Sequence, residues 1–341
     1  MFIVHGEKSR AGILANRFAI GAQSASMSLV RGKVGRLPRE VTRLSAEFKQ
    51  LKGEDLYFWV QNKSIGRDLY RAILSERNEL AGRKEINILL DSPGGDVHSA
   101  YKIFQLFRRY AGRVRVYVIS YAKSAATFVC LAADEFVMGE NAELGPMDMQ
   151  VPDPRHPRRS VSALDGFKMV EYLREYALET LDYASIVLKR RLQFRDMEDV
   201  LPHSIPFVQG ITTPLYGQVE PLDLGEYGRI LGIVKDYGIR VMGRAERFRG
   251  LTQKEIENLL DRIISSYPSH GFVIDFEEAV DAGLAPRKLE TDEEKLFDPI
   301  TDWIESTDEE CVGIIPAPSP LQAITATVKV DVTAPPPTQN N

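Results

Sequence analysis

Residues 121–148 have the sequence YAKSAATFVCLAADEFVMGENAELGPMD, which decides the fold class more than any other stretch of the chain. The part SAATFVCLAAD is apolar on nearly every side, which predicts a helix buried on all its faces. The run EFVMG directly after it has the apolar character of a buried strand. Ser124 begins the helix, where the next backbone N–H, that of Ala125, has no partner within the helix. A hydroxyl at this position can project into a cleft beside a free N–H group.

The same alternation of strand and helix occurs upstream of this stretch. LYFWV at 56–60, INILL at 86–90 and VRVYVIS at 114–120 are short apolar runs typical of strands in a parallel sheet. Between the last two runs, apolar residues recur at steps of three and four, which predicts an amphipathic helix; they are Val97, Ala100, Phe104 and Phe107. The sequence therefore predicts an α/β fold with a mainly parallel sheet and flanking helices.

A second motif, DSPGGDV at 91–97, lies between a predicted strand and a predicted helix. The paired glycines Gly94 and Gly95 let the backbone approach a bound chain or anion, and they leave N–H groups pointing outward. A tight strand-to-helix turn would use the same residues, and Ser124 taken alone could simply cap its helix. Together the two motifs favour a catalytic site, because ligands of such sheets gather where the strands end.

With both motifs in view, the run from LYFWV to ENAELGP resembles the Clp-fold serine proteases, most closely the serine dehydrogenase proteinase branch, related to signal peptide peptidase A and NfeD-type proteases. The ending YPSHGFVIDFEEAVDAGL at 267–284 looks like the closing strand and helix of that branch. The resemblance implies a Clp/crotonase-type spiral with Ser124 as nucleophile. It also implies self-association as a homo-oligomer and an oxyanion hole made of backbone N–H groups, those of Gly94, Gly95 and Ala125.

The catalytic base is the point where the chain departs from the Clp peptidases proper. They place a histidine downstream of the serine, where this chain has GPMDMQV at 145–151. Other branches use a lysine further along, and Lys168 in GFKMVEYLREYALE offers one. Lys168 would need burial to lower its pKa until much of the amine is neutral. Alternatively, Lys168 is an exposed residue that pairs with Glu171 or Glu175 along its helix.

Other residues near these motifs receive weaker interpretations. His156 lies among prolines and arginines, which predicts an exposed loop, and Lys123 is expected to face away from its neighbour Ser124 or to touch substrate. Ala126 stands where many relatives have glycine, which bears on how easily a peptide passes the serine. The remaining histidines lie in surface or turn contexts without metal-ligand spacing, so neither a metal nor another cofactor is predicted; they are His98, His203 and His270.

Composition sets the broad class of the protein. The 341 residues are 44% hydrophobic and 27% charged, as in ordinary globular proteins, and a net charge of −5 gives no reason to expect nucleic-acid binding. No apolar run approaches the length of a transmembrane helix, so the prediction is a cytoplasmic protein without a transmembrane segment. Cys130 and Cys311 lie far apart in the chain, so no disulfide framework is expected.

Three regions are predicted along the chain. Residues 1–54 form a basic N-terminal extension, residues 55–288 the peptidase domain with an insertion at about 151–256, and residues 289–341 an acidic segment with a disordered Pro/Thr-rich tail. Within the insertion a helix is expected to begin at Ser162, with Asp165 completing a capping box. Residues 202–221 are expected to be rich in turns.

The functional expectation is a serine endopeptidase that hydrolyses peptide bonds in a peptide or protein substrate through a dyad of Ser124 and Lys168. Two alternatives remain open at this point. One is a catalytically silent Clp-fold scaffold that binds a protein partner, which the missing histidine and Ala126 favour. The other is a crotonase-like acyl-CoA enzyme, because crotonases share the fold and a similar oxyanion device. The sequence does not identify the substrate.

Overall fold

The computed structural model describes residues 39–153, 156–194, 196–306 and 310–315. Its centre is a six-stranded sheet in the order β10-β1-β2-β3-β5-β9, parallel except for the antiparallel pair of β10 and β1. The strands are β1 Leu56–Val60, β2 Arg83–Asp91, β3 Ala111–Val118, β5 Glu135–Met138, β9 Arg287–Lys288 and β10 Cys311–Ile314. The predicted α/β class with a mainly parallel sheet is confirmed.

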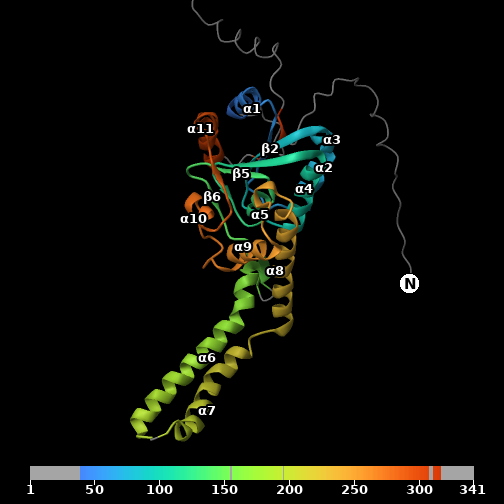
Figure 1. The fold of residues 1–341 in the computed structure, drawn as a ribbon. Coiled ribbons are helices and arrows are strands. Elements are labelled where there is room, and N and C mark those ends of the chain that lie inside the picture. Colours follow the sequence, from blue (N-terminus) through green and yellow to red (C-terminus); the bar gives the residue numbers. More distant parts are fainter. Residues whose placement is uncertain (1–38, 154–155, 195, 307–309, 316–341) are drawn as a thin grey trace, which may run out of the picture.

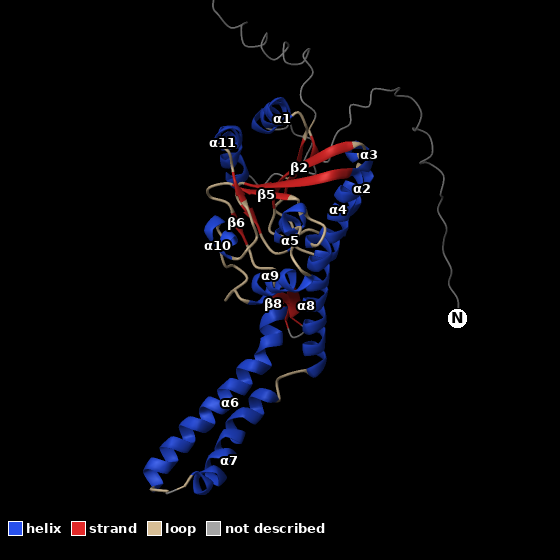
Figure 2. Ribbon diagram, viewed as in Figure 1, coloured by secondary structure: helices blue, strands red, loops and turns tan. Residues whose placement is uncertain are grey.

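Helices cover both faces of this sheet (Figure 1, Figure 2). They are α1 Arg39–Lys52, α2 Arg67–Ser75, α3 Arg77–Leu80, α4 Val97–Tyr110, α5 Ala125–Ala132, α6 Ala163–Leu192, α7 Met197–Tyr216, α8 Pro221–Met242, α9 Gln253–Ser265, α10 Phe276–Asp281 and α11 Thr291–Ser306. Two short strand pairs lie beside the main sheet, β4 Tyr121–Ala122 with β6 Glu143–Leu144, and β7 Gln150–Asp153 with β8 His156–Ser162. No helix in the described part of the chain has the length and apolarity needed to cross a bilayer.

The continuous apolar runs of the strands follow from burial on both faces of the sheet. Side chains alternate between the two faces of a strand, so Tyr57 and Trp59 enter one core, with α4 and α5, while Leu56 and Phe58 enter the other, with α1 and α11. All eight residues of α5 are buried, as its apolar sequence predicted. The helix that follows Ser124 therefore lies in the interior of the protein.

Segments on both sides of the predicted peptidase domain pack against its sheet. Helix α11 belongs to the acidic segment, yet its apolar residues Phe297 and Ile300 pack in the same core as Phe48 of α1, and β10 closes one edge of the sheet. Glu293 of α11 is fully buried and accepts hydrogen bonds from Arg287. The segment is therefore an amphipathic helix, which its many charged residues made difficult to predict from the sequence. Residues 1–38 and 316–341, which include the predicted disordered tail, lie outside the described residues.

Helices α6 and α7 form an antiparallel arm that projects from the body of the molecule (Figure 1). Ser162 caps α6 by accepting hydrogen bonds from the N–H groups of Leu164 and Asp165, which confirms the predicted helix start. Most of the stretch expected to be rich in turns is instead helix α7, although it contains Pro202, Pro206 and Pro214. Proline keeps a helical φ, and packing against α6 compensates for the hydrogen bonds that the prolines remove.

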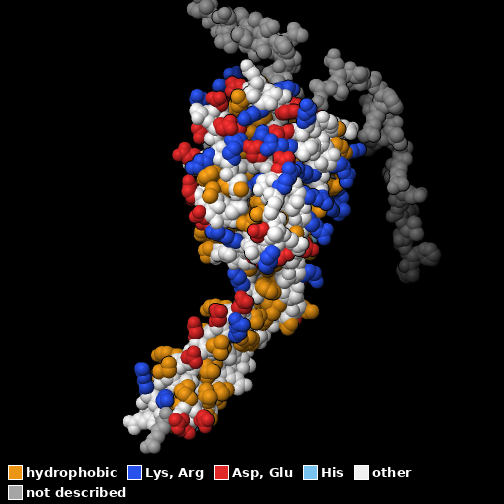
Figure 3. All heavy atoms as spheres, viewed as in Figure 1, with side chains coloured by type: hydrophobic (Ala, Val, Ile, Leu, Met, Phe, Trp, Pro, Cys, Tyr) orange, Lys and Arg blue, Asp and Glu red, His pale blue; other side chains and the backbone are white. Residues whose placement is uncertain are grey.

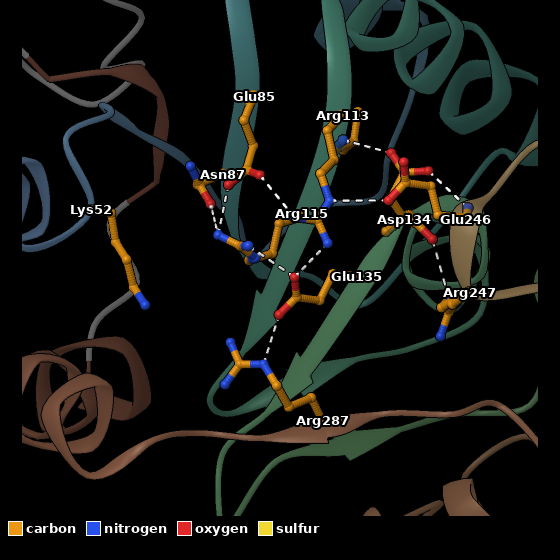
Figure 4. Close-up of polar contacts among 12 residues, drawn as sticks. Lys52, Glu85, Asn87, Arg113, Arg115, Asp134, Glu135, Glu246, Arg247 and Arg287 are labelled. Atoms are coloured by element: carbon orange, nitrogen blue, oxygen red, sulfur yellow. Dashed lines mark hydrogen bonds and ion pairs between the residues drawn. The ribbon is translucent and has the colours of Figure 1, made fainter.

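A network of charged side chains links four neighbouring strands of the sheet (Figure 4). Glu135 of β5 pairs with Arg115 of β3 at 2.9 Å and with Arg287 of β9 at 2.7 Å, and Arg115 also pairs with Glu85 of β2. Burial alone would raise the pKa of Glu135, but its hydrogen bonds to Arg287 and Arg115 outweigh that effect and lower it. The network thus joins β2, β3, β5 and β9 through their side chains, in addition to the backbone pairing of these strands.

Candidate active site

Ser124 lies between β4 and α5 in an unusual backbone conformation. Its φ is 50° and its ψ is −115°, a combination that disfavours residues with a Cβ. The residue is 7% exposed, and its side chain forms no capping hydrogen bond to α5 and none to any other described residue. The alternative that Ser124 merely caps its helix is therefore excluded, and its hydroxyl has no structural partner.

The two motifs of the sequence analysis meet at this point. Gly94 and Gly95 have φ of 90° and 141°, values that favour glycine. A Cβ on Gly94 would lie 2.9 Å from the Cβ of Ser124 and 3.0 Å from the backbone nitrogen of Ala125, and closer still to the carbonyl oxygen of Lys123. Glycine is thus required at position 94 by the close approach of the chain that carries Ser124.

Two of the three N–H groups predicted to form an oxyanion hole have no partner among the described residues. They belong to Gly95 and Ala125, whereas the N–H of Gly94 donates to the Oγ of Ser92 at 3.2 Å. The N–H of Ala126 is also occupied, since it donates to the carbonyl oxygen of Lys123 at 2.8 Å. Free backbone donors beside a free hydroxyl are the groups that stabilise the oxyanion of an acyl-transfer reaction.

Lys168, on the second turn of α6, lies in a different environment. Its Nζ donates to the carbonyl oxygen of Ser265, at the end of α9, at 2.5 Å. The side chain is exposed, and no described hydrogen bond or ion pair joins it to Glu171, Glu175 or Ser124. Lys168 lines an open cavity of about 840 Å³ at the base of the arm, and Ser124 is not among the residues that line it. The dyad of Ser124 and Lys168 stays a prediction.

The same cavity presents a histidine that the sequence analysis left without a role. His270 lines it, and the Nδ1 of His270 pairs with the carboxylate of Asp148, whose side chain is only 5% exposed. The hydrogen bond to Asp148 raises the pKa of His270 above its ordinary value, while partial burial and the positive charge of Lys123 oppose that rise. The two residues are 122 positions apart in the chain, so no local spacing could reveal the pair.

The other residues considered as bases are engaged elsewhere. Lys123 pairs with Glu143 at 2.5 Å, and its Nζ also lies 3.4 Å from the carbonyl oxygen of Leu144. His98 bonds the hydroxyl of Tyr237, and the ring of His203 stacks on Phe194. The side chain of His156 lies outside the described residues. The described part of the chain contains no group of three or more His, Cys, Asp or Glu side chains that could hold a metal ion.

Comparison with known proteins shows a similarity to one protein family over part of the chain. Residues 63–189 match the family model described as ClpP-like SDH-type serine proteinase. Two uncharacterized proteins of Methanocaldococcus jannaschii are similar over shorter stretches. MJ0137 is 41% identical over 68 residues, 20% of this chain and 24% of that protein, and MJ1495 is 26% identical over 110 residues, 32% and 36%. The chain thus spans about a quarter to a third of the length of these relatives.

Solved structures of proteases align over most of the chain at low identity. A mutant of the membrane-bound stomatin-specific protease 1510-N aligns with 72% of this chain and 83% of its own at 15% identity and a TM-score of 0.39. The ClpP protease catalytic domain from Plasmodium falciparum aligns with 76% and 95% at 12% identity and a TM-score of 0.35. Over residues 63–189, which include both Gly94–Gly95 and Ser124, the chain is similar to the ClpP-like serine proteinases of the SDH type.

Proposed function

We propose that this protein is a serine peptidase in which Ser124 attacks the carbonyl carbon of a peptide bond. The observation that carries the proposal is the state of Ser124: a hydroxyl without a structural bond, in a disfavoured backbone conformation, at the start of a buried helix. Disfavoured backbone conformations concentrate at active sites, where surrounding structure maintains them for function. The family match over residues 63–189 supports the same conclusion.

The free N–H groups of Gly95 and Ala125 would bind the oxyanion that forms when Ser124 attacks. Preorganised donors of this kind stabilise the developing charge without having to reorganise during the reaction. Gly94 contributes differently from the expectation, because its N–H already donates to Ser92. Its role in the proposal is to bring the turn against Ser124, which the lack of a side chain permits.

We propose Lys168 as the base for Ser124, on the strength of the family resemblance. In this role its Nζ would leave the carbonyl oxygen of Ser265, which it bonds at 2.5 Å, and approach Ser124 in the complex with substrate. Catalytic hydrogen bonds are often long in a structure without substrate and tighten when substrate binds, so the proposal does not require contact beforehand.

The experiment that tests the function compares the wild type with Ser124→Ala in hydrolysis of casein and in labelling by a fluorophosphonate. Both signals should disappear in Ser124→Ala, because the covalent bond to the enzyme forms at the missing oxygen. Ser75→Ala is the matched control, since the Ser75 hydroxyl bonds the carbonyl oxygen of Ala72 on α2, outside the site. Activity that persists in folded Ser124→Ala would refute the proposal, and a folded wild type that never reacts would favour the silent scaffold.

We also propose that the arm mediates self-association. Figure 3 shows hydrophobic side chains gathered along α6 and α7, where a monomer would leave them in contact with water. The exposed hydrophobic residues on the two helices include Phe167, Tyr172, Leu178, Tyr183, Ile186, Ile205 and Phe207. A second copy of the chain is the occupant that fits, because the family resemblance implies a homo-oligomer and the apolar surface extends over both helices.

A further inference from the structure

The carboxylate of Asp91 is buried and pairs with no cation among the described residues. Asp91 is the last residue of β2 and is 1% exposed. Side chains alternate along a strand, so Asp91 lies on the same face as Leu89, which packs in the core that α1 and α11 cover. The Oδ2 of Asp91 accepts a hydrogen bond from the N–H of Tyr121 at 3.2 Å. This carboxylate therefore depends on uncharged donors.

Burial makes the charge of Asp91 unfavourable for the fold. It raises the pKa of Asp91 to about 6, while hydrogen bonds from the N–H of Tyr121 and the side chain of Ser120 oppose that rise and the negative charge of Glu305 on α11 adds to it. An asparagine has nearly the same shape and could accept the same N–H without a charge. Stability alone therefore favours an uncharged side chain at this position.

Asp91 and Ser92 together hold the strand that leads into Ser124. The N–H of Ser92 donates to the carbonyl oxygen of Tyr121 at 3.1 Å, and the carbonyl oxygen of Ser92 accepts from the N–H of Lys123 at 3.0 Å. The carboxylate of Asp91 adds a third bond on this edge, from the N–H of Tyr121. Two consecutive residues of one chain segment thus bind three backbone groups directly upstream of Ser124.

The same segment continues into the glycine turn, so it links the two halves of the site. Ser92 accepts the N–H of Gly94 at its Oγ, and Gly94 in turn lies against Ser124. Ser124 has the disfavoured φ of 50°, and such conformations persist only where the surrounding structure maintains them. A weaker bond between Asp91 and Tyr121 would loosen the strand that maintains it.

We propose that Asp91 is a positioning residue, whose ionised carboxylate holds the N–H of Tyr121 and thereby orients Ser124 for attack. The inference rests on Ser124 being the nucleophile. Charged acceptors form hydrogen bonds roughly twice as strong as neutral ones, so protonation of Asp91 weakens this bond. The charge that destabilises the fold is then the charge on which the reactivity of Ser124 depends.

Several titratable or charged groups on neighbouring elements surround Asp91 or share its face of the sheet; they are Arg115 and Tyr117 of β3, Tyr121 of β4, Cys311 of β10 and Glu305 of α11. Burial raises the pKa of Cys311 to about 12 and that of Tyr117 further, so both stay neutral near pH 6. Arg115 is paired with Glu85 and Glu135. Asp91 is therefore the group on this face that we expect to change its protonation near pH 6.

The test compares the wild type with Asp91→Asn in the second-order rate of fluorophosphonate labelling of the full chain, between about pH 5 and pH 8. The ratio of the two rates at each pH cancels every titration that both proteins share, including that of the base. We expect nearly equal rates at the acid end and a wild type that is about 5- to 10-fold faster at the alkaline end, because the charged acceptor forms the stronger bond. The step in the ratio should lie at about pH 6.

Asp55→Asn is the matched control. Asp55 bonds Arg83 at 2.8 Å, at the opposite end of β1 and β2 from the site. Its loss removes a carboxylate that is paired in the fold, but it leaves the bond between Asp91 and Tyr121 in place. The rate of wild type relative to Asp55→Asn should therefore stay near one at every pH.

Stability distinguishes positioning from a merely structural role. The pKa of Asp91 is higher in the fold than in the unfolded chain, so proton binding favours the fold, and this stabilisation is lost as pH rises from about 4 to about 6. The urea midpoint of the wild type should therefore fall relative to that of Asp91→Asn while its relative labelling rate rises. A structural role alone would move both quantities in the same direction.

Hydrogen exchange at the N–H of Tyr121 tests the same bond in the wild type, should Asp91→Asn fail to fold. Its protection, corrected for the intrinsic exchange rate, should increase as pH rises through about 6. If folded wild type is never labelled at Ser124, the proposed function itself fails. If Ser124 is labelled but the rate ratio is the same at every pH, or if the protection of Tyr121 does not change, only the role of Asp91 is overturned.

Discussion

Replacing Ser124 by glycine should stabilise the fold although it removes the proposed nucleophile. At φ 50° and ψ −115° the backbone is the mirror image of an ordinary extended conformation, which glycine adopts freely and residues with a Cβ do not. Conformations of this kind cost about 1–3 kcal/mol. The greater conformational freedom of glycine in the unfolded chain reduces this gain in stability by roughly 0.5–1 kcal/mol. Relative to Ser124→Ala, which keeps the Cβ, we expect Ser124→Gly to gain about 1 kcal/mol in free energy of unfolding.

The assay is urea denaturation of both variants under identical conditions, followed by circular dichroism. Both variants lack the hydroxyl, so their difference isolates the backbone. Ser185, in the interior of α6, provides a control pair of opposite sign, because glycine in a helix interior is less stable than alanine by about 1 kcal/mol. The reasoning would be refuted if Ser124→Gly proved less stable than Ser124→Ala, as in the control pair.

Two further predictions concern the glycine turn and the arm. Gly94→Ala places a Cβ against Lys123 and Ser124, so its free energy of unfolding should fall by about 1–3 kcal/mol more than that of Gly82→Ala, a position with φ of 80° but no atom within 4 Å of the added Cβ. Gly94→Ala should also lose fluorophosphonate labelling. Equal losses of stability in urea denaturation would contradict the packing argument. Tyr183→Ser, on the exposed face of the arm, should weaken self-association in sedimentation velocity, whereas Val280→Ser, also exposed but on α10, should not. A wild type that sediments as a monomer at all concentrations would contradict the role of the arm.

The elements predicted correctly are those whose signal is local. The strand runs at 56–60 and 86–90 are apolar throughout because both faces of the sheet are covered. Helix α5 and the Ser162 cap follow from short patterns that hold wherever the segment lies in the fold. The two motifs together predicted a site because ligands of parallel sheets gather where the strands end, and the structure brings Gly94 and Ser124 together.

The features that the sequence did not predict depend on tertiary contacts. Helix α11 was not predicted because its acidic residues outnumber the apolar residues of its buried face. The role of that face follows only from its packing against α1. The prolines of α7 suggested turns, since nothing local shows that α6 would support a helix there. The pair of His270 and Asp148 forms only when the chain after α9 returns beside residues 144–148, so no spacing rule could have found it.

The central claim, that Ser124 is the nucleophile served by the neighbouring N–H groups, is tested most directly by a crystal structure of the full chain after reaction with a fluorophosphonate. The account predicts a covalent bond from phosphorus to the Oγ of Ser124, with the phosphonyl oxygen within hydrogen-bond distance of the N–H groups of Gly95 and Ala125. An adduct on a different residue, or a phosphonyl oxygen that points into solvent away from both N–H groups, would contradict it.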